Sequence, residues 1–152
     1  VKAVINSNEN RKKLHTQRIE FILGKKIKNK NITFLGVTFK PNTDDMRDST
    51  SLTMIPYLSK KGAKINYYDP TGQKSEFNKL KNCKFVNNIS DSCKNADLVI
   101  LHTEWDEFKS LEFKKIIKNK KFKIYDLRNL YDYDEMIKKK FKYFSIGRPT
   151  IN

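Results

Sequence analysis

The chain has 152 residues, of which 38% are hydrophobic and 32% charged, and its formal net charge is +15. This length suits one domain with a sizeable core. No apolar run approaches the roughly 18 residues of a membrane span, and neither a signal peptide nor a low-complexity segment is visible. We therefore expect a globular, cytoplasmic protein. Because the first residue is Val1 and not Met, we also expect the chain to be cut from something longer.

The basic charge has two explanations. One is binding to nucleic acid or to a membrane surface. The other is codon composition, because Lys, Asn and Ile, all frequent here, have A/T-rich codons. The lysines are scattered over predicted helix faces and turns, where solvated charge is normal. We favour this second explanation and expect no nucleic-acid or membrane partner, although the positive field should help to attract an anionic ligand.

The first predicted element is a helix over residues 9–23, with Asn8 or Asn10 as its cap and Gly24 at its end. Helical spacing places part of its apolar residues in one buried stripe, which the others widen on one side. The stripe and its extension comprise Leu14, Ile19, Phe21, Ile22 and Leu23.

Strands and helices then alternate along the chain. Runs of β-branched, apolar and aromatic residues predict strands over 32–36, 64–69, 84–86, 97–103, 122–126 and 143–147. Helical segments are predicted over 51–62, 73–80, 90–96 (with Ser90 as cap), 105–119 and 132–141. Strands that are apolar on both faces belong to parallel sheets covered by helices. The pattern predicts an α/β fold: a doubly wound, mostly parallel, Rossmann-like sheet with helices on both faces.

Ligands of such sheets bind at the carboxyl ends of the strands, near the point where the strand order reverses. Lys40 and Arg47 follow the first strand, and Arg128 follows a later one. Three cations that converge on one cleft could bind phosphate or carboxylate. The alternative is that they are solvated loop charges, with Asp44 and Asp45 orienting them or capping the next helix.

Other reactive residue types show no useful spacing. His15 and His102 have no metal-ligand partners nearby, so we expect structural roles and no metal site. Cys83 and Cys93 match no CxxC motif and are expected to be ordinary reduced thiols. No nucleophile–base pair is visible, so we expect no catalytic residue within this chain.

Five blocks, in matching order from about residue 4 to residue 149, now point to a family. The loop "GVTFKPNTDDMRDSTSL" closely resembles the signature G-x-x-F-K-x-[ND]-T-D-D-x-R-x-S-x-S of the nucleotide-sugar 6-dehydrogenases, which include the UDP-glucose 6-dehydrogenases. The segments "GAKINYYDP", "ADLVILHTEWDEFKSL", "YDLRNLYDYDEM" and "FKYFSIGRP" resemble later blocks of the same family. Two departures are Leu127, where Gly is usual, and Thr38, where Ala is usual.

The resemblance implies that residues 11–152 form the C-terminal UDP-binding domain of such an enzyme. Residues 1–10 resemble the end of the helix that joins it to an upstream domain. Family members are NAD-dependent and convert UDP-glucose to UDP-glucuronate in two hydride transfers. Their catalytic Cys and their G-x-G-x-x-G domain lie upstream, and neither motif is present here. The resemblance also implies a homodimer or larger assembly of the whole enzyme.

The family's binding residues map onto four positions of this sequence. Phe39, Lys40 and Arg128 correspond to residues that contact the nucleotide sugar, and Arg47 corresponds to one that reaches NAD. Two alternatives stay open. The sugar nucleotide could be a UDP-N-acetylhexosamine or GDP-mannose, or the chain could be a stand-alone basic binding module.

Overall fold

The computed structural model describes residues 2–151, except for the side chains of residues 2–8. Six parallel strands form one sheet in the order β3-β2-β1-β4-β5-β6. The strands are β1 (Asn31–Leu35), β2 (Lys64–Tyr68), β3 (Cys83–Phe85), β4 (Leu98–Leu101), β5 (Lys123–Asp126) and β6 (Tyr143–Ser145). This confirms the predicted doubly wound fold. The strand order reverses between β1 and β4, so the switch point lies at their carboxyl ends.

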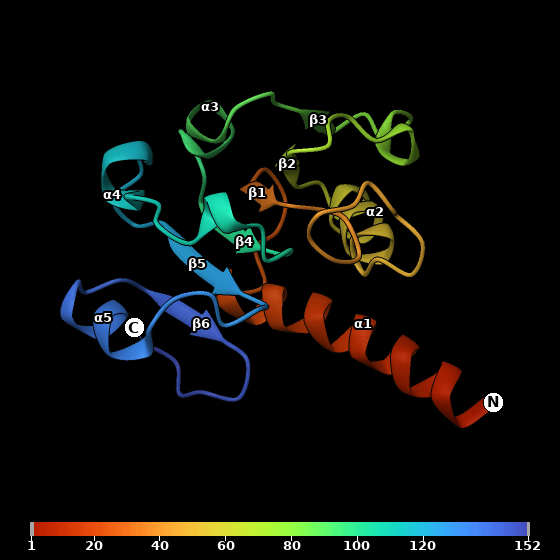
Figure 1. Cartoon of the computed structure of the whole chain (residues 1–152), viewed down its shortest axis with the longest axis horizontal. Coiled ribbons are helices and arrows are strands. Elements are labelled where there is room, and N and C mark those ends of the chain that lie inside the picture. The colour runs from red at the N-terminus through yellow and green to blue at the C-terminus, as the bar shows by residue number, and fades with distance from the viewer. Residues whose placement is uncertain (1, 152) are drawn as a thin grey trace.

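Helices cover both faces of the sheet (Figure 1). One core cluster joins the sheet to α1 (Lys2–Ile22), α2 (Ser51–Lys60) and the short 3-10 helix η1 (Ser75–Phe77). The other joins it to α3 (Ile89–Cys93), η2 (Asp106–Phe108), α4 (Phe113–Ile116) and α5 (Tyr133–Lys138). None of the helices in the described part of the chain has the length and apolarity that crossing a bilayer requires.

The central strand β4 explains why the sheet needs both layers. All four of its side chains are fully buried, with Leu98 and Ile100 in the first core cluster and Val99 and Leu101 in the second. Side chains of a strand alternate between its faces, so a strand that is apolar throughout must be covered on both sides. Burial of each such side chain contributes about 1.5–3 kcal/mol.

Helix α1 differs from the prediction in the residue at which it begins and in the width of its buried apolar stripe. It runs unbroken from Lys2, so neither Asn8 nor Asn10 caps it, because an interior Asn costs an established helix only a fraction of a kcal/mol. Ile19 and Ile22 are buried as expected. Leu14 and Phe21, however, are 61% and 74% exposed. At 3.6 residues per turn both point well away from Ile19, so neither reaches the sheet.

Two further boundaries were predicted wrongly. The side chain of Asn88, and not that of Ser90, caps α3 by accepting a hydrogen bond from the Asp91 amide at 2.7 Å. The helix predicted over 73–80 is only the single turn η1. The N-terminal part of α1 extends away from the sheet (Figure 1). Its assignment to an inter-domain helix stays a prediction, and Val1 lies outside the described residues.

Candidate functional site

Gly36, at the end of β1, sets the path of the loop that follows. Its φ of +77° lies in the left-handed region, and a Cβ there would sit 2.6 Å from the Thr103 Cβ. Glycine is therefore required both by conformation and by the close approach of the loop after β4. The buried Asp69, after β2, accepts a hydrogen bond from the Val37 amide at 2.9 Å. These contacts fix the β1 loop over the switch point.

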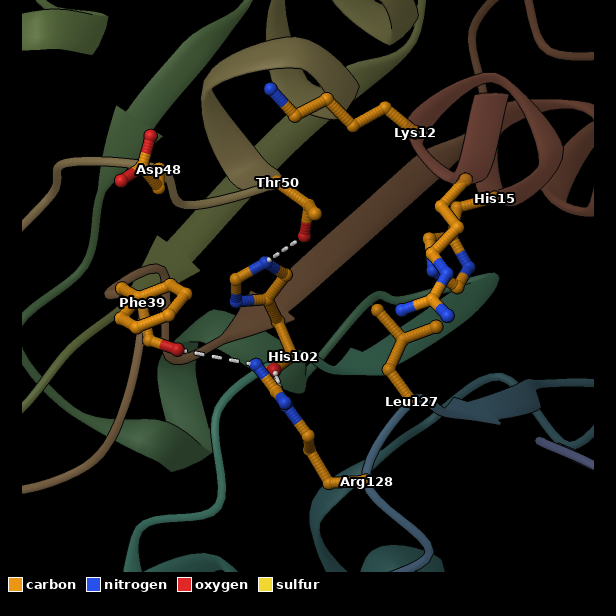
Figure 2. Close-up of a pocket in the computed structure, with 9 residues that line it drawn as sticks. Lys12, His15, Phe39, Asp48, Thr50, His102, Leu127 and Arg128 are labelled. Carbon is orange, nitrogen blue, oxygen red and sulfur yellow. Dashed lines mark hydrogen bonds between the residues drawn. The ribbon is translucent and has the colours of Figure 1, made fainter. Parts of the chain in front are cut away.

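A pocket of about 410 Å³ opens beside this loop (Figure 2). We call it the switch-point pocket. Its walls come from α1, the segment between β1 and α2, and the loops after β4 and β5. Its lining residues are Arg11, Lys12, His15, Phe39, Asp48, Thr50, His102, Leu127 and Arg128. The pocket is rich in cationic and hydrogen-bonding groups, as a site for an anionic polar ligand requires.

Arg128 is held at this pocket by main-chain oxygens. Its Nε donates to the His102 carbonyl at 2.9 Å and its Nη2 donates to the Phe39 carbonyl at 3.2 Å (Figure 2). Glu104 approaches with one carboxylate oxygen 3.9 Å from Nε. The other guanidinium N–H groups have no protein partner among the described residues. They can therefore donate to a ligand, and a guanidinium binds phosphate or carboxylate in a planar, bidentate manner.

Hydrogen bonds to neighbouring residues hold the backbone around Arg128 in place. The buried carboxylate of Asp126 accepts from the Arg128 amide at 3.1 Å and from the Tyr131 amide at 3.2 Å. Asn129 has a φ of +52°, a conformation that Asn tolerates better than most residues. Leu127 is not among the described residues with positive φ, so this position does not need the usual Gly.

Two histidines, expected to be structural, line the pocket. His15 Nδ1 lies 3.1 Å from the Tyr125 hydroxyl, and His102 Nε2 lies 2.8 Å from the Thr50 hydroxyl. Burial, and then the positive charge of Arg128, lower the pKa of His102 to about 3. The same two causes lower the pKa of His15. Both side chains are therefore neutral at physiological pH. The position of His102 at the carboxyl end of β4 was the one sequence signal that could have placed it in the site.

The predicted site residues divide between two places. Phe39, 48% exposed, and Arg128 both line the switch-point pocket. Lys40 is exposed beside Phe39 but is not a lining residue. Arg47 lies in a separate shallow depression, where its Nη2 is 3.0 Å from Asp45 and its side chain is 87% exposed. The structure thus brings one of the three predicted cations, Arg128, to the wall of this pocket.

The cysteines show no sign of reactivity. Cys93 is buried, Cys83 is half-buried, and both are free thiols. Burial raises the pKa of each to about 12, which keeps the nucleophilic thiolate scarce. Among the described residues, no group of three or more His, Cys, Asp or Glu side chains is placed to hold a metal ion.

Comparison with known families now bears on this geometry. Residues 33–133 match the model of the UDP-glucose/GDP-mannose dehydrogenase family, UDP binding domain. The chain belongs to this family. The matched stretch includes Phe39, Arg128 and most of the pocket wall, whereas the pocket residues of α1 lie before it. The family's UDP binding domain is therefore the part of the chain that carries the predicted binding residues.

Individual relatives agree with the family match. The chain is 36% identical to the UDP-glucose 6-dehydrogenase of Rhizobium meliloti over 150 residues, which cover 98% of this chain and 34% of that protein. It thus spans about a third of the length of the curated relatives it matches.

Solved structures show the same fold. The NDP-N-acetyl-D-galactosaminuronic acid dehydrogenase of Methanosarcina mazei superposes with a TM-score of 0.73 at 26% identity, over 91% of this chain and 29% of that chain. The UDP-glucose dehydrogenase of Pyrobaculum islandicum gives a TM-score of 0.69 at 26% identity, over 82% of this chain and 28% of that chain.

Proposed function

We propose that this chain is the UDP-binding part of a UDP-glucose 6-dehydrogenase, an NAD-dependent enzyme that oxidises UDP-glucose to UDP-glucuronate. The observation that carries the proposal is the placement of Arg128. Its guanidinium is fixed by two main-chain carbonyls at the wall of the switch-point pocket, with further N–H groups free to donate to a ligand. Family membership and the named relatives support the choice of a UDP sugar.

Three residues have distinct roles in this proposal. Arg128 binds the UDP moiety through charge-assisted hydrogen bonds. Phe39 offers the half-exposed face of a ring to the ligand beside that contact. Lys40, exposed next to Phe39, provides a mobile cation near the sugar or the diphosphate. Domain limits of 1–10 for the end of a connecting helix and 11–152 for the binding domain belong to the same proposal, as does a homodimeric or larger whole enzyme in the cytoplasm.

NAD would serve as the hydride acceptor in this reaction. The end of β1 does not have the geometry that a dinucleotide site of this fold requires. Strand β1 ends at Leu35 and helix α2 begins only at Ser51, so no helix N-terminus directly follows the strand to receive a pyrophosphate. Arg47, with its exposed guanidinium, is the residue we propose to contact NAD, and the rest of the cofactor site belongs to protein outside this chain.

Calorimetric titration of the chain with UDP, GDP and inorganic pyrophosphate tests the proposal. We expect binding that is selective for UDP, because the chain belongs to a family of UDP binding domains, and weak, because part of the cleft is absent. An equal response to UDP and pyrophosphate would favour a basic binding module that recognises charge alone. Preference for GDP would favour GDP-mannose as the substrate. Without the upstream residues, the chain should form no NADH from UDP-glucose and NAD.

A further inference from the structure

Thr50 stands at the start of α2 but does not cap it. A Thr in this position usually accepts a hydrogen bond from an amide of the first helical turn. The Thr50 side chain makes no such bond, and its Oγ1 instead lies 2.8 Å from Nε2 of the buried His102 (Figure 2). Both residues line the switch-point pocket. The hydroxyl is thus diverted from the helix to the histidine.

The hydrogen bonds behind His102 determine which nitrogen carries its proton. The Thr103 hydroxyl donates its single proton to the Thr38 carbonyl at 2.9 Å, since a carbonyl can only accept. The same hydroxyl oxygen lies 3.0 Å from His102 Nδ1, so it must accept there and Nδ1 must donate. In a neutral imidazole the other nitrogen then has a lone pair. Nε2 therefore accepts the proton of the Thr50 hydroxyl.

His102 stays in this neutral form because its surroundings oppose a positive charge. The side chain is 1% exposed, and the positive charge of Arg128 lies near enough to disfavour protonation. The lowered pKa of His102 agrees with this geometry. With its only proton donated to Nε2, the Thr50 hydroxyl has lone pairs but no proton for a ligand.

We propose that the Thr50 hydroxyl is a specificity-determining hydrogen-bond acceptor for a donor group of the bound nucleotide sugar, and that His102 is the positioning residue that fixes this polarity. The inference rests on the proposed function. A UDP sugar offers donors in its ribose and sugar hydroxyls and in the uracil N3–H, whereas its ionised phosphate oxygens only accept. Arg128 supplies donors and Thr50 an acceptor, so the two residues would orient the ligand in one direction.

Binding measurements with matched ligands test the proposed contact. The wild-type chain and Thr50→Val are titrated with UDP-glucose, UDP, 2′-deoxy-UDP, 3′-deoxy-UDP and N3-methyl-UDP. Thr50→Val should weaken binding roughly two- to tenfold for ligands that carry the donor, and not at all for those that lack it. A loss with UDP-glucose but not UDP assigns the donor to the sugar, and a loss that disappears with one UDP analogue assigns it to the altered group. Thr50→Ser, which keeps the hydroxyl, should bind like the wild type.

Two results would overturn the contact while leaving the proposed function intact: unchanged binding of every ligand by Thr50→Val, or an equal loss with every ligand of the panel. A wild-type chain that binds none of these ligands would instead refute the proposed function, and this inference with it.

The positioning role of His102 has its own readout. In ¹⁵N NMR of the wild-type chain, the His102 ring should show a protonated Nδ1 and an unprotonated Nε2 at neutral pH. A proton on Nε2 would overturn the assigned polarity. His102→Phe removes the acceptor of the Thr50 proton, so the hydroxyl can then donate as well as accept, and this variant should prefer ligands with the donor less than the wild type does. Retention of the full preference in a folded His102→Phe chain would also overturn the role.

Discussion

Arg128 and Arg47 occupy opposite kinds of environment. Arg128 is bound by the uncharged carbonyls of His102 and Phe39, and its side chain is 34% exposed. Arg47 is 87% exposed and forms hydrogen bonds with the carboxylate of Asp45, whose pKa this contact lowers to about 2. Main-chain oxygens orient a guanidinium without neutralising it, whereas a hydrogen-bonded carboxylate does both. The Glu104 carboxylate lies 3.9 Å from Arg128 Nε and forms no hydrogen bond with it, so Arg128 keeps more of its charge for a ligand of the pocket, and Arg47 must exchange or share its partner to bind one.

The largest expected effect is on the stability of the fold and comes from a change at Gly36, in the loop whose Phe39 carbonyl accepts a hydrogen bond from Arg128. Gly36→Ala places a Cβ against Thr103 and imposes a left-handed φ on an L-residue, so we expect a loss of about 2–4 kcal/mol in the free energy of unfolding. Urea unfolding measures this loss. Gly72→Ala is the matched control, since Gly72 also has a positive φ but a Cβ added there would meet no atom within 4 Å. Equal losses in both variants would show that the close contact with Thr103 is unimportant.

Removal of the Arg128 side chain should have the next largest effect, which is on the affinity for UDP. Arg128→Ala is expected to weaken UDP binding ten- to a hundredfold, because each charge-assisted contact contributes about 1.5–3 kcal/mol. Arg128→Lys should recover little, since an ammonium lacks the planar donor set. Calorimetry with UDP measures both, and Arg47→Ala serves as the control that should change UDP affinity less than about twofold. If Arg47→Ala matched Arg128→Ala, the difference between the two environments would have no functional meaning.

Arg47 requires the whole enzyme for its test. There, Arg47→Ala should raise the apparent KM for NAD about tenfold, and Lys40→Ala should chiefly raise that for UDP-glucose. Steady-state kinetics and thermal melts of both variants provide the measurement. The rival explanation is that Arg47 merely pairs with Asp45 to hold the loop. It predicts equal changes in both KM values and a lower melting temperature, and Asp45→Asn should then reproduce them.

The stability of the chain should also depend on pH, because burial and the charge of Arg128 lower the pKa of His102. The pKa of His102 is lowered from 6.5 to about 3, so between these values the unfolded chain binds a proton that the folded chain does not. Stability should therefore fall as the pH drops below 6.5, by up to about 1.4 kcal/mol per pH unit, and should not depend on this group above 6.5.

Urea unfolding at about pH 5 and about pH 7.5 tests this expectation. His102→Phe should reduce the loss at the lower pH, although His15, whose pKa is also lowered, keeps part of it. Arg47→Ala should leave the loss unchanged because Arg47 is not among the groups that lower the pKa of His102. An undiminished loss in His102→Phe would show that other groups cause the acid sensitivity.

The sequence by itself determined the α/β class, the strands and the loop that carries Phe39 and Lys40. Fully apolar runs such as residues 98–101 have one stable placement, between two layers of helices, and this predicts the parallel sheet whose strand ends are the expected place for a ligand. The family signature in the same loop depends on local residue order and was equally visible. The limits of the helices were harder to predict from the sequence. An Asn in α1 is compatible with both a cap and a helix interior, and the packing of Ile19 and Ile22 favours the longer helix.

Only the tertiary structure decided which charged and polar side chains share the pocket. His15, Thr50 and His102 come from three distant segments, and no sequence spacing links them. Their roles depend on hydrogen bonds across the chain, such as the bond from Thr103 to Thr38 that sets the proton of His102. Likewise, Arg47 and Arg128 are the same residue type in loops that follow strands of one sheet. The carbonyls that hold the Arg128 guanidinium lie 26 and 89 residues away in sequence, so only the fold brings them into place, whereas Asp45, the partner of Arg47, is its near neighbour in the same loop.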